Sequence, residues 1–350
     1  MPPAETPIES LLPLDLMELE VGYGLVPLVD PSRGGDLLRR IQSIRRQFAT
    51  SLGLIVPPIH IRDNLQLDGS TYRLLIKGIE VARGSVMADR SLAMNPGDVQ
   101  ERIAGIDTIE PAFGLPAQWI AGDTKEHAEA LGYTVVDAST VIATHLTELI
   151  RANAHELIGR QEAQELINVF AESNPKVVEE LIPTLLSLGD VLSVIRQLLR
   201  ERVSIRDLRT ILETLADCAK ATKNLTLLTE LVRQRLAKQI TGSLRAPDGD
   251  LYVLTLAPDL EEGIRTSLVQ DGEQVVIGMN PTRVTTLMEA LESTMRELAM
   301  SDFQAALLVA PDIRRPLRDL VERFVPQLAV ISHREVEAGV RVKGVKTMEA

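Results

Sequence analysis

Residues 305–333 read AALLVAPDIRRPLRDLVERFVPQLAVISH, and they indicate the fold class at the end of the chain. Two short apolar runs, AALLVA and QLAVIS, flank RRPLRDLVERF, in which apolar residues recur at helical spacing. A strand, a helix and a second strand in this order predict a βαβ unit, with parallel strands joined by a right-handed crossover. Strand-like LYVLTL and QVVIGM and a helix near 281–300 come before it, so residues 239–350 are expected to form a C-terminal α/β domain.

The length and composition favour a globular protein with more than one domain. Its 350 residues exceed the roughly 250–300 at which a single hydrophobic core stops growing. The net charge of −12 argues against nucleic acid as a partner, because phosphate backbones are bound chiefly by clustered Lys and Arg. The single cysteine, Cys218, favours a structural thiol in a reducing compartment. No apolar run of about 18 residues and no signal peptide is found, so we expect neither a membrane span nor secretion within this sequence.

The rest of the chain divides by composition into a linker, a domain with an insertion, and a helical domain. Residues 1–20 are rich in proline, acidic residues and leucine, which is typical of a linker. Residues 89–137 hold Gly, Pro and short strand-like runs, and they predict a small inserted lobe. Around this lobe, residues 21–88 and 138–158 are assigned to a first α+β domain. Helical patterns fill residues 159–238 and predict an all-helical third domain.

Within the first domain we expect a strand at Leu25–Val29, a helix over Asp36–Leu52 that ends at Gly53, and a strand in IHIRDNL. The pair Asp68-Gly69 predicts a hairpin turn. The helix is amphipathic, and its apolar stripe consists of Leu37, Leu38, Ile41, Ile44 and Phe48. Four arginines fall largely off this stripe: Arg39, Arg40, Arg45 and Arg46. They form either a solvated face or a contact with an acidic neighbouring subunit.

The helical domain has expected breaks at Gly159, Pro175, Gly189 and Ser204. In SIRDLRTILETLADCAK, Ser204 is predicted to cap a helix, with Asp207 three residues later. One face of this helix is apolar and comprises Ile205, Leu208, Ile211, Leu212 and Leu215.

No catalytic, metal or cofactor motif is found. The P-loop, GxGxxG after a strand, HExxH and CxxC are all missing from the sequence, and so is a G-x-S-x-G elbow. His145 and His155 would point about 80° apart on one helix. We therefore predict no enzyme, no cofactor and no metal. Asp312 is the one carboxylate at a strand end, the position that α/β enzymes favour, so a soluble α/β enzyme with its site there is the alternative.

The stretch IEPAFGLPAQWIAGD, residues 109–123, is unusual in a protein that is only 3% aromatic. A loop stiffened by prolines cannot hide its own ring, so Phe113 either fills a core or lines a groove. For Trp119 we expect the core.

Seven stretches resemble, in order, the cytosolic half of the flagellar type III export gate family, which is shared with virulence secretion systems. They are MELEVGYGLVPLVD, LLRRIQSIRRQF, PPIHIRDN, EPAFGLPAQWI, GYTVVDASTVIATHL, GRQEAQ and VSIRDLRTILETLA. The resemblance implies four compact subdomains, a non-enzymatic role and self-association into a ring of nine copies. It also implies a membrane half ahead of this sequence and a place at the cytoplasmic face of the bacterial inner membrane.

The implied partners are flagellar export chaperones with their cargo, and other export apparatus proteins. In the family, chaperones dock in an apolar dimple that uses an acid, a phenylalanine and a threonine. By position these are Glu110, Phe113 and Thr144, with Pro111, Val136 and Val141 as apolar walls. Some members have Asp where Glu110 stands, which would alter the hydrogen-bond geometry while keeping the charge. The gate of a virulence injectisome is the alternative within the family, and EPAFGLPAQWI and ATHLTEL favour the flagellar branch.

Overall fold

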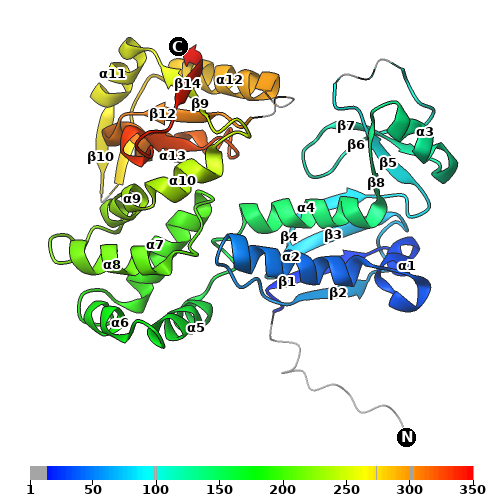
Figure 1. Cartoon of the computed structure of the whole chain (residues 1–350), viewed down its shortest axis with the longest axis horizontal. Helices are drawn as coiled ribbons and strands as arrows, with labels where there is room; N and C mark the ends of the chain where they lie inside the picture. Colours follow the sequence, from blue (N-terminus) through cyan, green and yellow to red (C-terminus); the bar gives the residue numbers. More distant parts are fainter. Residues whose placement is uncertain are drawn as a thin grey trace, which may run out of the picture. The chain divides into compact units, whose positions relative to one another are not determined.

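The computed structural model describes residues 14–97, 99, 101–272, 274–298, 301 and 303–349. The chain divides into two compact units, residues 1–162 and 163–350 (Figure 1). Most of the expected linker lies outside the described residues, and the domain boundaries within each unit stay predictions. The fold is mixed α/β, with four sheets in the described part of the chain.

The first sheet of the first unit is built around strand β1, which lies mostly within the residues expected to form the linker. The strand order is β2-β1-β3-β4. Strand β1 runs parallel to β2 and antiparallel to β3, so β1, α2 and β2 form a βαβ unit. The prediction that all residues up to 20 are linker is wrong, because Met17, Leu19 and Val21 alternate with acids and fill the core. The four strands are β1 Met17–Val21, β2 Ile59–Asp63, β3 Thr71–Ile76 and β4 Ile79–Ser85.

Two further predictions near this sheet are wrong. Residues Leu25–Val29 are helical rather than extended, as η2 Tyr23–Leu25 and α1 Val26–Val29. Asp68-Gly69 forms a turn between β2 and β3, which do not pair with each other. The hairpin turn lies at Lys77-Gly78 between β3 and β4, where both residues have positive φ (51° and 75°) as tight hairpin turns require.

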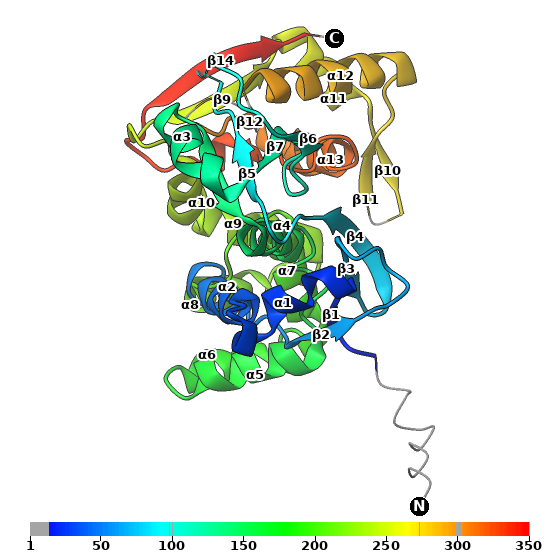
Figure 2. The same cartoon turned by 90° about the vertical axis from the view of Figure 1, so that its right-hand side faces the viewer.

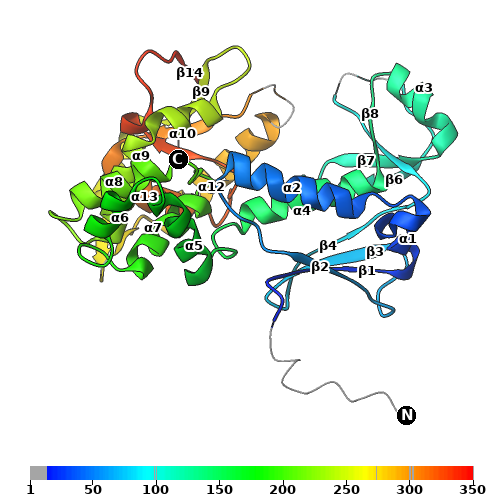
Figure 3. The same cartoon turned by 60° about the horizontal axis from the view of Figure 1, so that its bottom comes forward.

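Helices α2 Leu37–Ser51 and α4 Ala138–Ala152 lie side by side over the first sheet (Figures 1 and 3). The predicted stripe of α2 is buried except for Leu38, which is 39% exposed, and Gly53 follows the helix with φ 75° as expected. Three of the four arginines bind within the unit, and Arg39 does so through an exposed pair with Asp36 (3.6 Å). Arg40 pairs with Asp137 at the start of α4 (3.0 Å), and Arg45 Nε donates to the Val56 carbonyl (3.0 Å).

The second sheet lies within the predicted lobe and has the antiparallel order β6-β7-β5-β8. Strands β5, β7 and β8 coincide with strand-like runs of the sequence, and helix α3 Lys125–Ala130 lies between β7 and β8 in the chain. Trp119 is 3% exposed, so the prediction that it belongs to the core is confirmed. The strands are β5 Ser91–Met94, β6 Ile106–Ile109, β7 Pro116–Ile120 and β8 Thr134–Asp137.

Helices make up the first part of the second unit. The expected break at Gly189 is wrong, because Ser187 caps α7 in a capping box with Asp190 and Gly189 lies inside the helix. Asp207, not Ser204, caps α8 by accepting a hydrogen bond from Thr210 N (3.1 Å). The apolar face predicted for this helix is buried. The helices are α5 Arg160–Ala171, α6 Pro175–Leu181, α7 Leu188–Arg200, α8 Leu208–Cys218, α9 Leu225–Arg235 and α10 Ala237–Leu244.

The C-terminal sheet confirms the βαβ prediction: β12 and β13 are parallel and joined by α13. Its order is β13-β12-β9-β14, with every pairing parallel. Helix α12 lies beside β14 (Figure 2), and the separate strands β10 and β11 form an antiparallel pair. The elements are β9 Leu251–Leu256, α11 Pro258–Thr266, β10 Leu268–Asp271, β11 Gln274–Ile277, α12 Pro281–Leu298, β12 Ala306–Val309, α13 Pro311–Val321, β13 Val330–Ser332, η5 His333–Glu335 and β14 Val342–Met348.

Candidate functional site

A tight turn connects β6 to β7 in the first unit and carries Phe113 at its tip. Glu110 N donates to the Leu115 carbonyl (2.8 Å), and Gly114 N donates to the Glu110 carbonyl (2.9 Å). Gly114 has φ +70°, which a residue with a side chain adopts only with strain. The turn therefore has one defined backbone path, with Phe113 in its middle.

The side chain of Glu110 holds this turn from inside. One carboxylate oxygen accepts from Ala112 N (2.9 Å) and the other from Phe113 N (2.7 Å), and Glu110 is 3% exposed. Hydrogen bonds of backbone amides to a carboxylate are charge-assisted and stronger than neutral ones. Both oxygens of Glu110 are thus used to fix the conformation of the segment that displays Phe113.

Phe113 itself is 60% exposed, and Ile109 at the end of β6 is 68% exposed. Among the described residues, the Phe113 ring therefore lies at the surface and does not fill a core. The two side chains are four residues apart on one hairpin, and exposed apolar side chains that gather into a patch are typical of interaction sites.

A buried pair links strand β3 to helix α4 and lies within the electrostatic influence of Glu110. Burial, and then the nearby charge of Glu110, raise the pKa of the Tyr72 hydroxyl well above its usual value. The same hydroxyl lies 2.7 Å from His145 Nδ1, and the two rings meet edge to face. Burial lowers the pKa of His145, so its ring is neutral at neutral pH. The sequence suggests His145 only as a possible metal ligand and does not single out Tyr72, because the pairing of buried polar residues on a strand and a helix leaves no local signal.

Of the remaining predicted site residues, all but Pro111 lie on or just before α4. Thr144 is half-buried and directly precedes His145, and Val136 is half-buried in β8, one residue before the cap of α4. Pro111 is half-buried in the turn. Val141 is 2% exposed, so its side chain belongs to the core beneath α4 and offers almost no surface.

Asp312, the residue expected to mark an enzyme site, makes a structural contact instead. Asp312 lies at the N-terminus of α13 and accepts a hydrogen bond from Arg265 Nε (2.6 Å), which lowers the pKa of Asp312. Across the described residues, no three His, Cys, Asp or Glu side chains are grouped as a metal site would require. Within the same residues, no helix has both the length and the apolar character to cross a bilayer.

Comparison of the sequence with known proteins gives long matches. The FHIPEP family profile matches residues 2–341. The flagellar biosynthesis protein FlhA of Bacillus subtilis is 45% identical over 342 residues, which cover 98% of this chain and 50% of that protein. The chain thus spans about half the length of the curated relatives it matches.

Solved structures give matches over nearly the whole chain. The complex of the Chlamydia pneumoniae CdsV and CdsO proteins contains a chain with 28% identity and a TM-score of 0.84, covering 95% of this chain and 97% of that one. Nonameric EPEC SctV-C matches with a TM-score of 0.77 over 96% of this chain and 98% of that one; at 23% identity it shows the fold alone.

Proposed function

Because the chain belongs to the FHIPEP family, we propose that it is the cytosolic docking platform of a flagellar type III export gate. In this role it binds export chaperones that carry cargo and hands the cargo to the export channel, without covalent chemistry. The FlhA relative is 45% identical to this chain, whereas the chain in the CdsV structure is 28% identical to it. The higher identity favours the flagellar branch over an injectisome gate. Assembly into a nine-membered ring at the cytoplasmic face of the inner membrane, and contacts with other apparatus proteins, belong to the same proposal.

The exposure of Phe113 on a turn fixed by Glu110 is the observation that carries the docking proposal. Aromatic side chains that enter a partner's surface provide much of the energy of an interface. A segment that is already ordered loses little conformational entropy on binding, and this raises affinity. An amphipathic helix of a chaperone, laid with its apolar face on Phe113, is the mode of recognition that fits such an anchor.

The other residues have distinct roles in the proposal. Glu110 positions Phe113 and is too buried to be a main contact itself. Pro111, Val136 and Thr144 are partly exposed, which allows them to contribute apolar surface and a hydroxyl to the proposed docking site. Val141 lies on the buried face of α4 and stabilises the packing of this helix.

The test is a titration of a purified flagellar chaperone–cargo pair against the chain and its Phe113→Ala variant. Removing a buried anchor of about 2 kcal/mol weakens binding roughly 30-fold. The matched control is Phe324→Ala, which removes a ring that is 53% exposed in the other unit. Equal affinity of the chain and Phe113→Ala would disprove the site, and a loss with Phe324→Ala as large as with Phe113→Ala would show a non-specific effect.

A further inference from the structure

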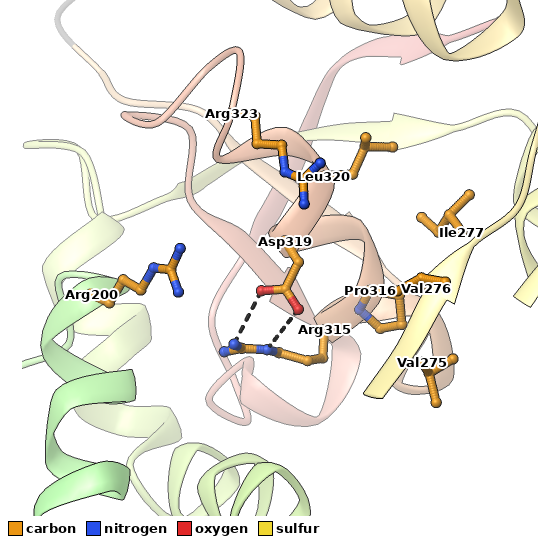
Figure 4. A pocket seen from close by; sticks show the side chains of 9 residues that line it. All are labelled: Arg200, Val275, Val276, Ile277, Arg315, Pro316, Asp319, Leu320 and Arg323. Carbon is orange, nitrogen blue, oxygen red and sulfur yellow. Dashed lines mark hydrogen bonds and ion pairs between the residues drawn. The ribbon is translucent and has the colours of Figure 1, made fainter. Parts of the chain in front are cut away.

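The second unit contains a pocket between α7, β11 and α13 that the docking proposal does not use (Figure 4). Its volume is about 250 Å³. Of the residues that line it, three are arginines, five are apolar and one is an aspartate. A basic pocket with apolar walls is unexpected in a chain with a net charge of −12.

Strand β11 presents an edge to this pocket rather than one face. Val275, Val276 and Ile277 all line the pocket, although consecutive side chains of a strand point to opposite faces. Three consecutive residues border one cavity when the cavity runs along the edge of their strand. The opposite edge of β11 is paired with β10.

The register of β10 and β11 identifies the backbone groups on the pocket edge. Gly278 N donates to the Ser267 carbonyl (2.8 Å), so this is a hydrogen-bonded pair. Because hydrogen-bonded and non-hydrogen-bonded pairs alternate in an antiparallel ladder, the N–H and C=O groups of Val275 and Ile277 point away from β10. In the described part of the chain no backbone hydrogen bond to these groups is found on the pocket side.

The charges around the pocket leave two guanidinium groups available. Arg315 is occupied, with Asp319 on one side and Glu201 on the other. Arg200 uses only Nε, which donates to Glu322 (2.7 Å).

Arg323 is exposed and has no carboxylate partner among the residues that the structure describes. Asp319 is the one acid in the lining; burial raises its pKa, while Arg315 opposes this shift. The pocket therefore favours negatively charged guests.

We propose that this edge of β11 binds an extended acidic segment of a partner protein as an added strand. The guest backbone pairs with Val275 and Ile277, while its carboxylates meet Arg323 and the terminal nitrogens of Arg200. Main-chain pairing provides affinity in this mode, and side-chain pockets provide specificity. A peptide fits better than a small anion, because the carbonyl groups of the strand edge and the apolar walls offer nothing to a phosphate. The inference is independent of chaperone docking, which concerns the other unit.

The test uses the full 350-residue chain and a fluorescent synthetic peptide, acetyl-TEVEVEVT-amide, in an anisotropy titration. Two comparison peptides separate the two parts of the proposal. One replaces every Glu with Lys, and the other carries an N-methyl group on every backbone amide, so that neither of its edges can donate a strand hydrogen bond. Both are expected to bind at least about tenfold more weakly than the acidic peptide.

Two variants test the protein side. Arg323→Gln is expected to weaken binding of the acidic peptide about tenfold, since charge-assisted hydrogen bonds are lost. Val275→Pro removes an N–H on the pocket edge but none that pairs with β10, so the hairpin is retained and binding falls by a similar factor. Arg296→Gln on α12 is the control, because it removes an exposed arginine (74%) elsewhere in the unit and is expected to change nothing.

Several results would overturn the proposal. The N-methylated peptide could bind as tightly as the unmodified one, or inorganic phosphate could displace the peptide equally from the chain and from Val275→Pro; either would show a small-anion site. If sedimentation shows that the chain self-associates and that Val275→Pro abolishes this self-association, the strand edge is occupied by a second copy of the chain instead of an acidic partner. If Val275→Pro does not fold, Arg323→Gln still tests the role of the arginine, and the N-methylated peptide still tests strand pairing.

Discussion

Arg314 and Glu201 form an ion pair inside the second unit, with Nη1 2.6 Å from Oε2 and side chains that are 0% and 4% exposed. Glu201 also binds Arg233 (3.1 Å), which in turn binds the buried Glu335. Glu230 contacts Arg314 from α9. These charges connect the ends of α7 and α9 with α13 and η5, so the helical part and the C-terminal sheet of this unit share one polar core.

Glu201→Gln is expected to destabilise the second unit by about 3–5 kcal/mol, because removing one partner of a buried ion pair leaves the arginines without compensation. Hydrogen exchange of peptides from α7 and α9 measures this effect. The control is Glu292→Gln, which breaks an exposed pair with Arg296 on α12 and is expected to change stability by less than about 1 kcal/mol. Equal exchange rates in both variants would contradict a structural role for the buried pair.

The same network predicts how stability depends on pH. Burial acts to raise the pKa of Glu201, but the charges of Arg233 and Arg314 outweigh it and hold that pKa well below its usual range. A lowered folded-state pKa contributes stability that is complete above the unfolded value of about 4.3 and is lost as the pH falls below it. Between about pH 4 and 3, the protonation of Glu201 in the unfolded state then lowers the free energy of unfolding by roughly 1.4 kcal/mol for each pH unit of acidification. Urea titrations of the second unit across this range should show a shallower acid loss in Glu201→Gln than in the unchanged chain.

Much of the fold follows from local patterns in the sequence. The βαβ unit at the end of the chain and the amphipathic helix α2 have the periodicity that their burial requires. Strand β1 is hard to predict because MELEV follows a proline-rich acidic stretch, although its alternation fits a strand. Asp68-Gly69 does not form a hairpin turn because β1 lies between β2 and β3, which the sequence does not show.

The candidate site was predictable only in part. The resemblance to the export gate family pointed to Phe113, and its exposure agrees with a surface role. The hydrogen bonds of Glu110 to its own turn depend on backbone geometry, and the Tyr72–His145 pair joins residues 73 positions apart. Neither leaves a pattern within any short window of sequence.

Gly84→Ala is expected to destabilise the first unit by about 1–3 kcal/mol, the usual cost of inserting a methyl group into a packed site. A Cβ at Gly84 would lie 2.5 Å from the Tyr72 hydroxyl oxygen, and that hydroxyl is held by His145. Unfolding followed by the fluorescence of Trp119, the single tryptophan, reports on this unit. Gly122→Ala is the matched control, because a Cβ there meets nothing within 4 Å. A loss of the same size in both variants would argue against a specific clash with Tyr72.

Glu110→Ala is expected to weaken chaperone binding about tenfold without changing the exposed ring, because two charge-assisted hydrogen bonds that fix the turn are lost. The exchange rates of the Ala112 and Phe113 amides should rise together with the dissociation constant. Glu110→Asp keeps the charge and a side chain that caps turns well, so it should retain most of the affinity. If Glu110→Ala speeds exchange of both amides but leaves affinity intact, the order of the turn is irrelevant to docking, and Phe113 binds as a flexible anchor.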